Sequence, residues 1–211
     1  MAVSLLAPFH IISYGTLLGA QAYQTFVGGI IAFRTLPRPQ FSTLQESIFP
    51  VYFSLQTALP LVMAITYPGE SIFMERGPSS LFGLLAESPR ITTLLPIVTM
   101  FLTGLTNLLV VGPMTVKVMK QRKHQETIDG KKSYDPHPHS KEMIRLNKSF
   151  SRFHGISSMV NLLGLISTVC SIPPLFNMFS AGDMAVTLIA RFMMPNKRFL
   201  PLSMDMLRLD I

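Results

Sequence analysis

The feature that most constrains this chain is its first uncharged run, Ala2 to Phe33, which contains no Lys, Arg, Asp or Glu. A helix needs about 20 residues to cross the roughly 30 Å hydrocarbon core of a bilayer, so the run is long enough to span a membrane. A cleaved secretory signal is the alternative, because the Ala-Gln-Ala tripeptide at 20–22 resembles a cleavage site. We favour a retained helix, since no basic residue precedes the run and eleven residues follow the tripeptide before the first charge.

Three further uncharged blocks repeat this pattern, at residues 47–69, 91–116 and 155–182. Hydrophobic residues make up 48% of the chain, charged residues only 14%, and the mean hydropathy is +0.40. Only helices and closed barrels satisfy their backbone polar groups in lipid, and the blocks lack the alternation of barrel strands. We therefore predict an all-α integral membrane protein, a bundle of four transmembrane helices with spans at about 3–33, 47–67, 91–116 and 155–179.

The connection between the third and fourth blocks concentrates positive charge. Residues 117–152 contain ten Lys and Arg against four Asp and Glu. Next to membrane helices, such a segment is explained by the positive-inside rule and by anionic headgroups rather than by nucleic acid. Apolar residues repeat at three and four from Met143 to Phe153, which predicts an amphipathic helix on the membrane surface before the fourth span. Residues 129–140 lack periodicity and are predicted to form a flexible loop.

Charge also predicts the orientation. The first and third connections, loops 34–46 and 117–153, carry more Lys and Arg than the second connection and the C-terminal tail. We therefore expect these two loops to be cytosolic and both termini to lie on the other side. The expected organisation is one four-helix domain over residues 1–182 and a peripheral or disordered tail over 183–211. No residue pattern indicates which organelle houses the protein.

Polar side chains within the predicted spans are the candidate functional residues. His10, Gln21 and Gln24 fall on one face of the first helix, while Asn107 and Asn161 lie in the third and fourth spans. These side chains either line an aqueous path or form hydrogen bonds between helices, and the second role is the commoner one. For His10 the functional alternatives are a proton relay or a ligand to a soft metal. We favour a hydrogen bond to a neighbouring helix.

Nothing in the sequence predicts catalysis, a cofactor or a metal. No Asp or Glu lies within a predicted span, and the chain has no Walker loop, no nucleophile elbow and no His-Glu-x-x-His motif. His137 and His139 lack further well-placed ligands, and the 14 methionines are scattered as in ordinary apolar packing. Cys170 is the single cysteine, so no intramolecular disulfide forms. We predict that the protein is not an enzyme.

Two stretches carry more specific motifs. The first, residues 10–53, contains Phe-Arg-x-Leu-Pro-Arg at 33–38 and Phe-Pro-x-Tyr-Phe at 49–53, and the second begins with Phe-His-Gly-Ile-Ser-Ser at 153–158. With the four-helix plan, these stretches resemble the transmembrane protein 205-like family, described as domain of unknown function 4149, over about residues 5–180. The matching residues include Arg34 and Arg38 at the first helix boundary and His154 at the entry to the fourth span.

This resemblance implies a small multi-pass membrane protein with no assigned enzymatic activity and with suggested links to membrane trafficking and drug resistance. Two functions therefore stay open. The leading hypothesis is a structural or trafficking component whose basic segment, 117–152, meets anionic membrane lipid or a protein partner. The competing hypothesis is a channel or transporter for small solutes or drugs, expected to be a homo-oligomer because four helices enclose little space. Polar residues around a water-sized cavity favour transport, whereas one-to-one hydrogen bonds favour a structural role.

Overall fold

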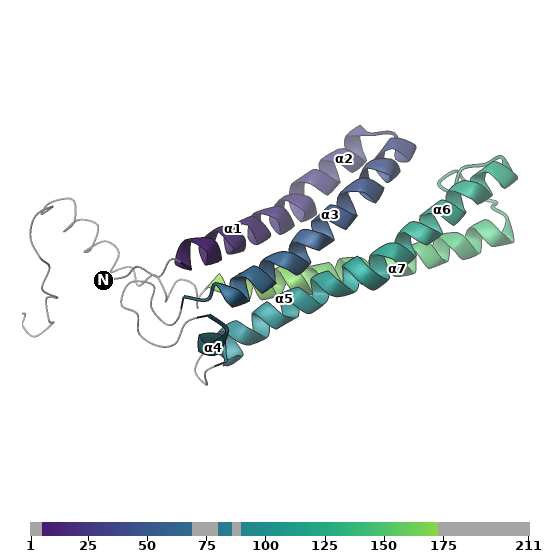
Figure 1. Cartoon of the computed structure of the whole chain (residues 1–211). Helices are drawn as coiled ribbons and strands as arrows, with labels where there is room; N and C mark the ends of the chain where they lie inside the picture. Colours follow the sequence, from purple (N-terminus) through teal and green to yellow (C-terminus); the bar gives the residue numbers. More distant parts are fainter. Residues whose placement is uncertain (1–5, 69–79, 86–89, 173–211) are drawn as a thin grey trace, which may run out of the picture.

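A computed structural model describes residues 6–68, 80–85 and 90–172 of the chain (Figure 1). All regular structure within these ranges is helical. The first helix runs through α1 (Ala7–Tyr23), a π-helical turn η1 (Gln24–Gly28) and α2 (Gly29–Thr35) without a break. This helix covers residues 7–33 of the predicted first span, while residues 1–5 lie outside the described part.

The second helix, α3 (Arg38–Ile65), begins much earlier than the predicted span. Only Leu36 and Pro37 connect it to α2, so the prediction of a loop over residues 34–46 was wrong. Pro39 is a helix breaker by residue type, yet it occupies the first turn of α3, where a proline costs no backbone hydrogen bond. The helix also continues through Pro50 and Pro60.

The third helix extends well past the predicted span as well. A short helix α4 (Ser80–Leu84) precedes it, and the helix itself comprises η2 (Arg90–Leu94), α5 (Leu95–Thr106), η3 (Asn107–Val111) and α6 (Gly112–Asp129). The prediction ended this helix at 116, where the charged residues begin. Charge marks the edge of the apolar region, but Lys, Arg and Gln are good helix formers and the helix continues to Gly130, a glycine with φ +59°.

The fourth helix, α7 (Lys141–Cys170), is one continuous helix of 30 residues. Its N-cap is Ser140, whose Oγ accepts a hydrogen bond from the Met143 amide at 3.1 Å. Residues 141–153 are therefore the first half of α7 rather than a separate amphipathic helix on the membrane surface. Their apolar stripe packs against α6, where Met143, Leu146 and Val118 are buried. The predicted end near 179 and the tail over 183–211 lie outside the described residues.

Three helices are long and apolar enough to cross a membrane: α3, the continuous helix Thr92–Asp129, and α7. They indicate a multi-pass integral membrane protein. The helix of α1 and α2 is not among these three. It carries His10, Gln21 and Gln24, which lower its hydropathy, so the fourth span stays a prediction.

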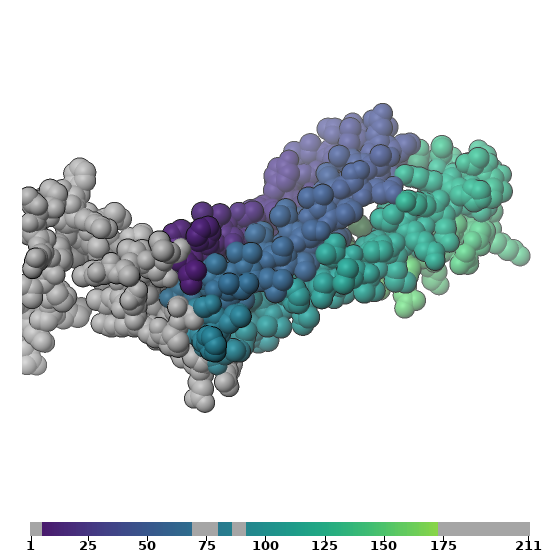
Figure 2. Space-filling view, viewed as in Figure 1, coloured from purple at the N-terminus to yellow at the C-terminus, as the bar shows by residue number. Residues whose placement is uncertain are grey.

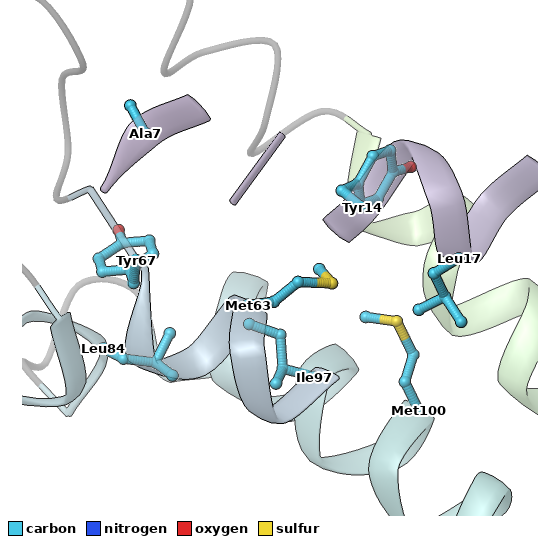
Figure 3. Close-up of a cluster of buried hydrophobic side chains, with 8 residues drawn as sticks. All are labelled: Ala7, Tyr14, Leu17, Met63, Tyr67, Leu84, Ile97 and Met100. Carbon is cyan, nitrogen blue, oxygen red and sulfur yellow. The ribbon is translucent and has the colours of Figure 1, made fainter. Parts of the chain in front are cut away.

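The helices pack as two hairpins lying side by side, α1–α2 with α3, and α5–α6 with α7 (Figure 1). The α6–α7 end forms one tip of an elongated molecule (Figure 2). Toward the opposite end, a hydrophobic cluster joins α1, α3, α4 and α5 (Figure 3). Met63 and Met100 face each other there, with Leu17 beside them. This cluster fixes the first hairpin against the second.

Candidate functional site

In the apolar part of the bundle, polar side chains lie among the buried residues, while large apolar side chains cover much of the outer surface. On α1 the buried set includes His10, Ser13 and Gln21, whereas Phe9 is 60% exposed and Phe26, in the following turn, is 63% exposed. A water-soluble bundle shows the reverse pattern. The inverted pattern is that of a bundle whose outer surface meets lipid.

His10 contacts α3 through its Nδ1 atom, which lies 2.9 Å from the carbonyl oxygen of Met63. Because that carbonyl can only accept, His10 Nδ1 carries the hydrogen. The ring also packs edge-on against Tyr67 with 6.2 Å between centroids. One turn along α1, the Tyr14 hydroxyl donates to the Thr168 carbonyl of α7 at 2.9 Å. His10 thus forms the interhelical hydrogen bond that the sequence favoured.

Asn161 of α7 is the centre of a hydrogen-bonded group near the middle of the bundle. Its Oδ1 accepts hydrogen bonds from the Tyr52 hydroxyl at 3.1 Å and from Gln56 Nε2 at 2.7 Å, both on α3. Gly104 of α5 packs closely on the same turn of α3, because a Cβ atom there would lie 2.8 Å from the Gln56 carbonyl oxygen. Three helices therefore meet at this level.

Asn107 of α5–α6 pairs with Ser157, one turn from Asn161 on α7. The Ser157 hydroxyl donates to Asn107 Oδ1 at 3.0 Å, and Asn107 Nδ2 donates to the Ser157 carbonyl at 3.3 Å. Asn107 is fully buried. The reciprocal pair satisfies both ends of the amide, as burial of an amide requires.

Gln21 and Gln24 have different surroundings although they lie three residues apart. Gln21 is buried on the inner face of α1, with its Nε2 near Gly164 of α7. Gln24 opens the π turn η1, and its side chain lies beside Gly28 and Gly29 of its own helix. Within the described residues Gln24 does not join the interhelical hydrogen bonds.

The boundary residues Arg34, Arg38 and His154 are exposed, and all lie toward the end of the bundle where α2 meets α3 and α7 begins. The Arg38 guanidinium sits 3.7 Å from the centre of the Phe33 ring, an arrangement that fits a cation–π contact. The His154 ring stacks on Phe150 at 5.6 Å. These contacts do not bring the three residues together into a site.

The same end carries the basic residues of α6 and α7. Several are ion-paired: Glu46 of α3 lies 3.2 Å from Lys120 and 3.7 Å from Lys123, and Glu126 lies 3.5 Å from Lys132. Other exposed cations have no ion-pair partner among the described residues. These are Lys117, Lys141, Lys148 and Arg152.

The tip between α6 and α7 is held by specific hydrogen bonds. Ser140 Oγ donates to Asp129 at 2.7 Å, and Asn147 Nδ2 donates to the Ser133 carbonyl at 3.2 Å. Glu126 accepts from the Ser133 amide at 3.0 Å. Partial burial works to raise the pKa of Glu126, but the hydrogen bonds from Ser133 and the Lys132 ammonium outweigh it and hold the pKa below its ordinary value.

The sequence singled out His10, Asn107 and Asn161 but not their partners. Tyr52, Gln56, Ser157 and the carbonyls of Met63 and Thr168 complete the contacts. A carbonyl partner has no sequence signal. Gln56 was recognisable from the sequence as the only amide in its predicted span, but the direction in which its side chain points depends on how α3 packs. Among the described residues no group of three or more His, Cys, Asp and Glu is placed to hold a metal ion.

Comparison with known proteins places the chain in a family. Residues 12–124 match the family described as "Domain of unknown function (DUF4149)". The chain belongs to the DUF4149 family. A relative within the curated proteins is "Xanthocillin biosynthesis cluster protein D" of Aspergillus fumigatus (strain ATCC MYA-4609 / CBS 101355 / FGSC A1100 / Af293), 32% identical over 167 residues that cover 79% of this chain and 86% of the relative. No solved structure matches this chain significantly.

Proposed function

We propose that this DUF4149 protein is a non-catalytic, four-span membrane protein with a structural or membrane-trafficking role, whose basic end binds anionic lipid headgroups in the cytosol. The α1–α2 helix is the fourth span in this proposal. At 1.5 Å per residue, Ala7 to Thr35 is roughly 43 Å long, more than the hydrocarbon core requires. Its outward-facing Phe9, Ile12, Phe26, Ile30 and Ile31 match the apolar surfaces of the other helices.

The observation that carries the proposal is the segregation of charge. Of the described Lys and Arg residues, all except Arg90 lie at the end that holds the α2–α3 connection and the α6–α7 hairpin. Each cation near an anionic leaflet contributes about 1 kcal/mol of attraction, and cytoplasmic loops are enriched in Lys and Arg. This distribution supports a cytosolic position for the basic end and a membrane surface as its partner.

The interior supports a structural role over catalysis. The polar groups of the buried residues His10, Tyr14 and Asn107 and of the half-buried Asn161 form direct hydrogen bonds between helices. Such bonds commonly stabilise membrane bundles by about 1 kcal/mol each. The resemblance to transmembrane protein 205-like proteins, with its suggested link to trafficking, supports the same role.

The experiment that tests the proposal compares two groups of cations that lie at different distances from the bilayer. Lys117, Lys148 and Arg152 lie close to the apolar part of the bundle, whereas Lys131, Lys132 and Lys141 lie toward the hairpin tip. From Gly155, the start of α7 is roughly 20 Å away along the helix, about twice the Debye length in ordinary buffer. Only the first three cations are within electrostatic reach of headgroups.

The full chain would be reconstituted in nanodiscs that contain phosphatidylcholine and phosphatidylserine, and the phosphatidylserine retained through purification would be measured. We expect the triple variant Lys117→Gln, Lys148→Gln, Arg152→Gln to retain less than the native protein. The matched variant Lys131→Gln, Lys132→Gln, Lys141→Gln removes the same charge and should retain as much as the native protein. Equal retention by both variants would contradict lipid binding at this end.

The relative's name favours one second candidate. "Xanthocillin biosynthesis cluster protein D" associates that relative with production of a small molecule, and a membrane protein in such a setting is suited to moving small solutes. Cysteine reporters at Gln21, Asn107 and Asn161 on a Cys170→Ala background would test it, with Met159 as the outward-facing control. Labelling of the three inner positions by a water-soluble reagent, without Met159, would establish an aqueous path. Protection of all three would exclude one.

A further inference from the structure

The interior of the bundle contains two buried side-chain oxygens without a hydrogen-bond partner among the described residues, Gln21 Oε1 and Thr25 Oγ1. Gln21 is only 2% exposed. A buried acceptor that forms no hydrogen bond costs about 1–3 kcal/mol, because it has lost its contact with water. Such groups are rare in folded proteins, and each calls for a partner.

Thr25 differs from most threonines and serines in these helices. Many hydroxyls here donate to the carbonyl four residues earlier in their own helix, including those of Thr57, Thr99, Thr115 and Thr168. Thr25 lies in the π turn η1, where the backbone is wound with wider spacing, and its hydroxyl makes no such bond. Single π turns occur frequently at functional positions in helices.

Gln21 lies next to the polar layer already described, since its Nε2 is near Gly164, one turn from Asn161 on α7. Gln21 and Thr25 are four residues apart, so their side chains lie on the same side of the helix. Thr25 Oγ1 lies beside the Tyr52 hydroxyl without hydrogen-bond geometry. Tyr52 uses its hydrogen to donate to Asn161, which leaves its oxygen able to accept.

We propose that one water molecule is bound inside the bundle between Gln21, Thr25 and Tyr52. It donates to Gln21 Oε1 and to the Tyr52 hydroxyl oxygen, and it accepts from the Thr25 hydroxyl. These three contacts match the number that a buried water typically makes, about three. This inference is independent of the lipid-binding proposal, since it concerns only the middle of the bundle.

The chemistry of the site selects water over a cation. The three groups are neutral, and no described Asp or Glu lies near them in α1, α3 or α7. Asn161 Oδ1 already accepts two hydrogen bonds, so it has little capacity to coordinate an ion. Neutral oxygens in this number do not repay the dehydration of a cation within a membrane.

The direct measurement uses the native full chain in nanodiscs. Solid-state NMR with ¹⁵N-labelled side-chain amides would detect short-range transfer of magnetisation from water to Gln21, which the variant Gln21→Met identifies by loss of its signal. Asn107 is the control, because its amide bonds directly to Ser157. Transfer to Gln21 but not to Asn107 is the expected result. No transfer to Gln21 would overturn the proposal. Transfer to both amides would also contradict it, because it would indicate a wider aqueous path rather than one bound water molecule.

Stability provides a second readout. Gln21→Met and Thr25→Val would each lower the unfolding midpoint, and the double variant should fall no further than the worse single variant because both remove the same water. Thr57→Val, which loses only a bond to its own helix, should add its effect independently. An unchanged or raised midpoint for Gln21→Met, or strictly additive effects of the two changes, would show that no molecule bridges these side chains.

Discussion

Within the single helix α7, residues 141–153 and residues 155–170 differ in what they bury and what they expose. The first half buries Met143 and Leu146 and exposes Lys141, Lys148 and Arg152. The second half buries Gly164, Ser167 and Thr168, together with one large apolar residue, Leu165. Its large exposed side chains are apolar: Ile156, Met159, Leu162, Leu163, Ile166 and Val169.

This difference indicates where the surroundings of α7 change along the helix. In water, removal of apolar surface drives packing, so α6 and the first half of α7 pair like a soluble hairpin. In lipid, the surroundings are as apolar as leucine, and helices associate through small residues and hydrogen bonds. We therefore expect the membrane boundary on α7 to lie at the inversion between Arg152 and Ile156, next to the exposed His154.

Truncation of leucines should separate the two halves most strongly. Leu146→Ala removes a buried side chain from the α6–α7 contact and should destabilise the hairpin by about 2–5 kcal/mol. Leu162→Ala removes a side chain that faces lipid and should cost less than about 1 kcal/mol. Chemical unfolding of both variants in nanodiscs measures the contrast. Equal losses of stability in the two variants would mean that both halves of α7 have the same surroundings.

Insertion of charge should show the opposite asymmetry. Met159→Lys places an ammonium on the apolar face and should cost about 2.5–3.5 kcal/mol near the middle of the bilayer, less nearer its surface. Ile144→Lys, at an exposed position in the first half, should change stability by no more than about 0.5 kcal/mol. A membrane-insertion assay and unfolding midpoints report the two changes. Tolerance of lysine at Met159 would move the boundary beyond that residue.

The sequence predicted the apolar parts of these helices better than their ends. Uncharged blocks identified the cores of α3, α5–α6 and α7, because composition is set by the surrounding lipid. Helix ends are set by backbone hydrogen bonds and capping, to which Pro37 and Ser140 contribute here. A charged residue such as Lys117 ends the apolar region without ending the helix.

The candidate site was predictable to a similar extent. Helical periodicity placed His10 and Gln21 on an inner face, and the structure buries both. Gln24 lay on the same predicted face, but η1 widens the helix at that residue and rotates the later residues about the helix axis. Contacts such as Asn107 with Ser157 depend on the register between α5 and α7, which no single-helix pattern contains.

Glycine substitutions should show how closely the second half of α7 packs against α5. A Cβ atom at Gly164 would lie 2.8 Å from Thr103 Oγ1, which donates to the carbonyls of Thr99 and Met100. Gly164→Ala should therefore cost about 1–3 kcal/mol by forcing α5 and α7 apart. Gly155→Ala has no atom within 4 Å of the added carbon and should be neutral or stabilising by up to about 1 kcal/mol. Unfolding midpoints that rank these variants the other way would contradict the close contact.

The smallest predicted effect concerns pH and belongs to the hairpin tip. The folded pKa of Glu126 lies below its ordinary value of 4.5, so its contribution to stability is complete above pH 4.5 and is lost as the pH falls through the folded pKa. Because Glu126 is only partly buried and its ion-pair partner Lys132 is exposed, we expect a loss below about 1 kcal/mol. Amide hydrogen exchange at Ser133, the residue whose N–H donates to Glu126, should quicken at acid pH relative to its intrinsic rate. In the variant Glu126→Gln, the exchange protection of the Ser133 amide should vary less with pH. If its pH dependence were the same as in the native protein, the hydrogen bonds of Asp129 and Asn147 would be what holds the tip in place.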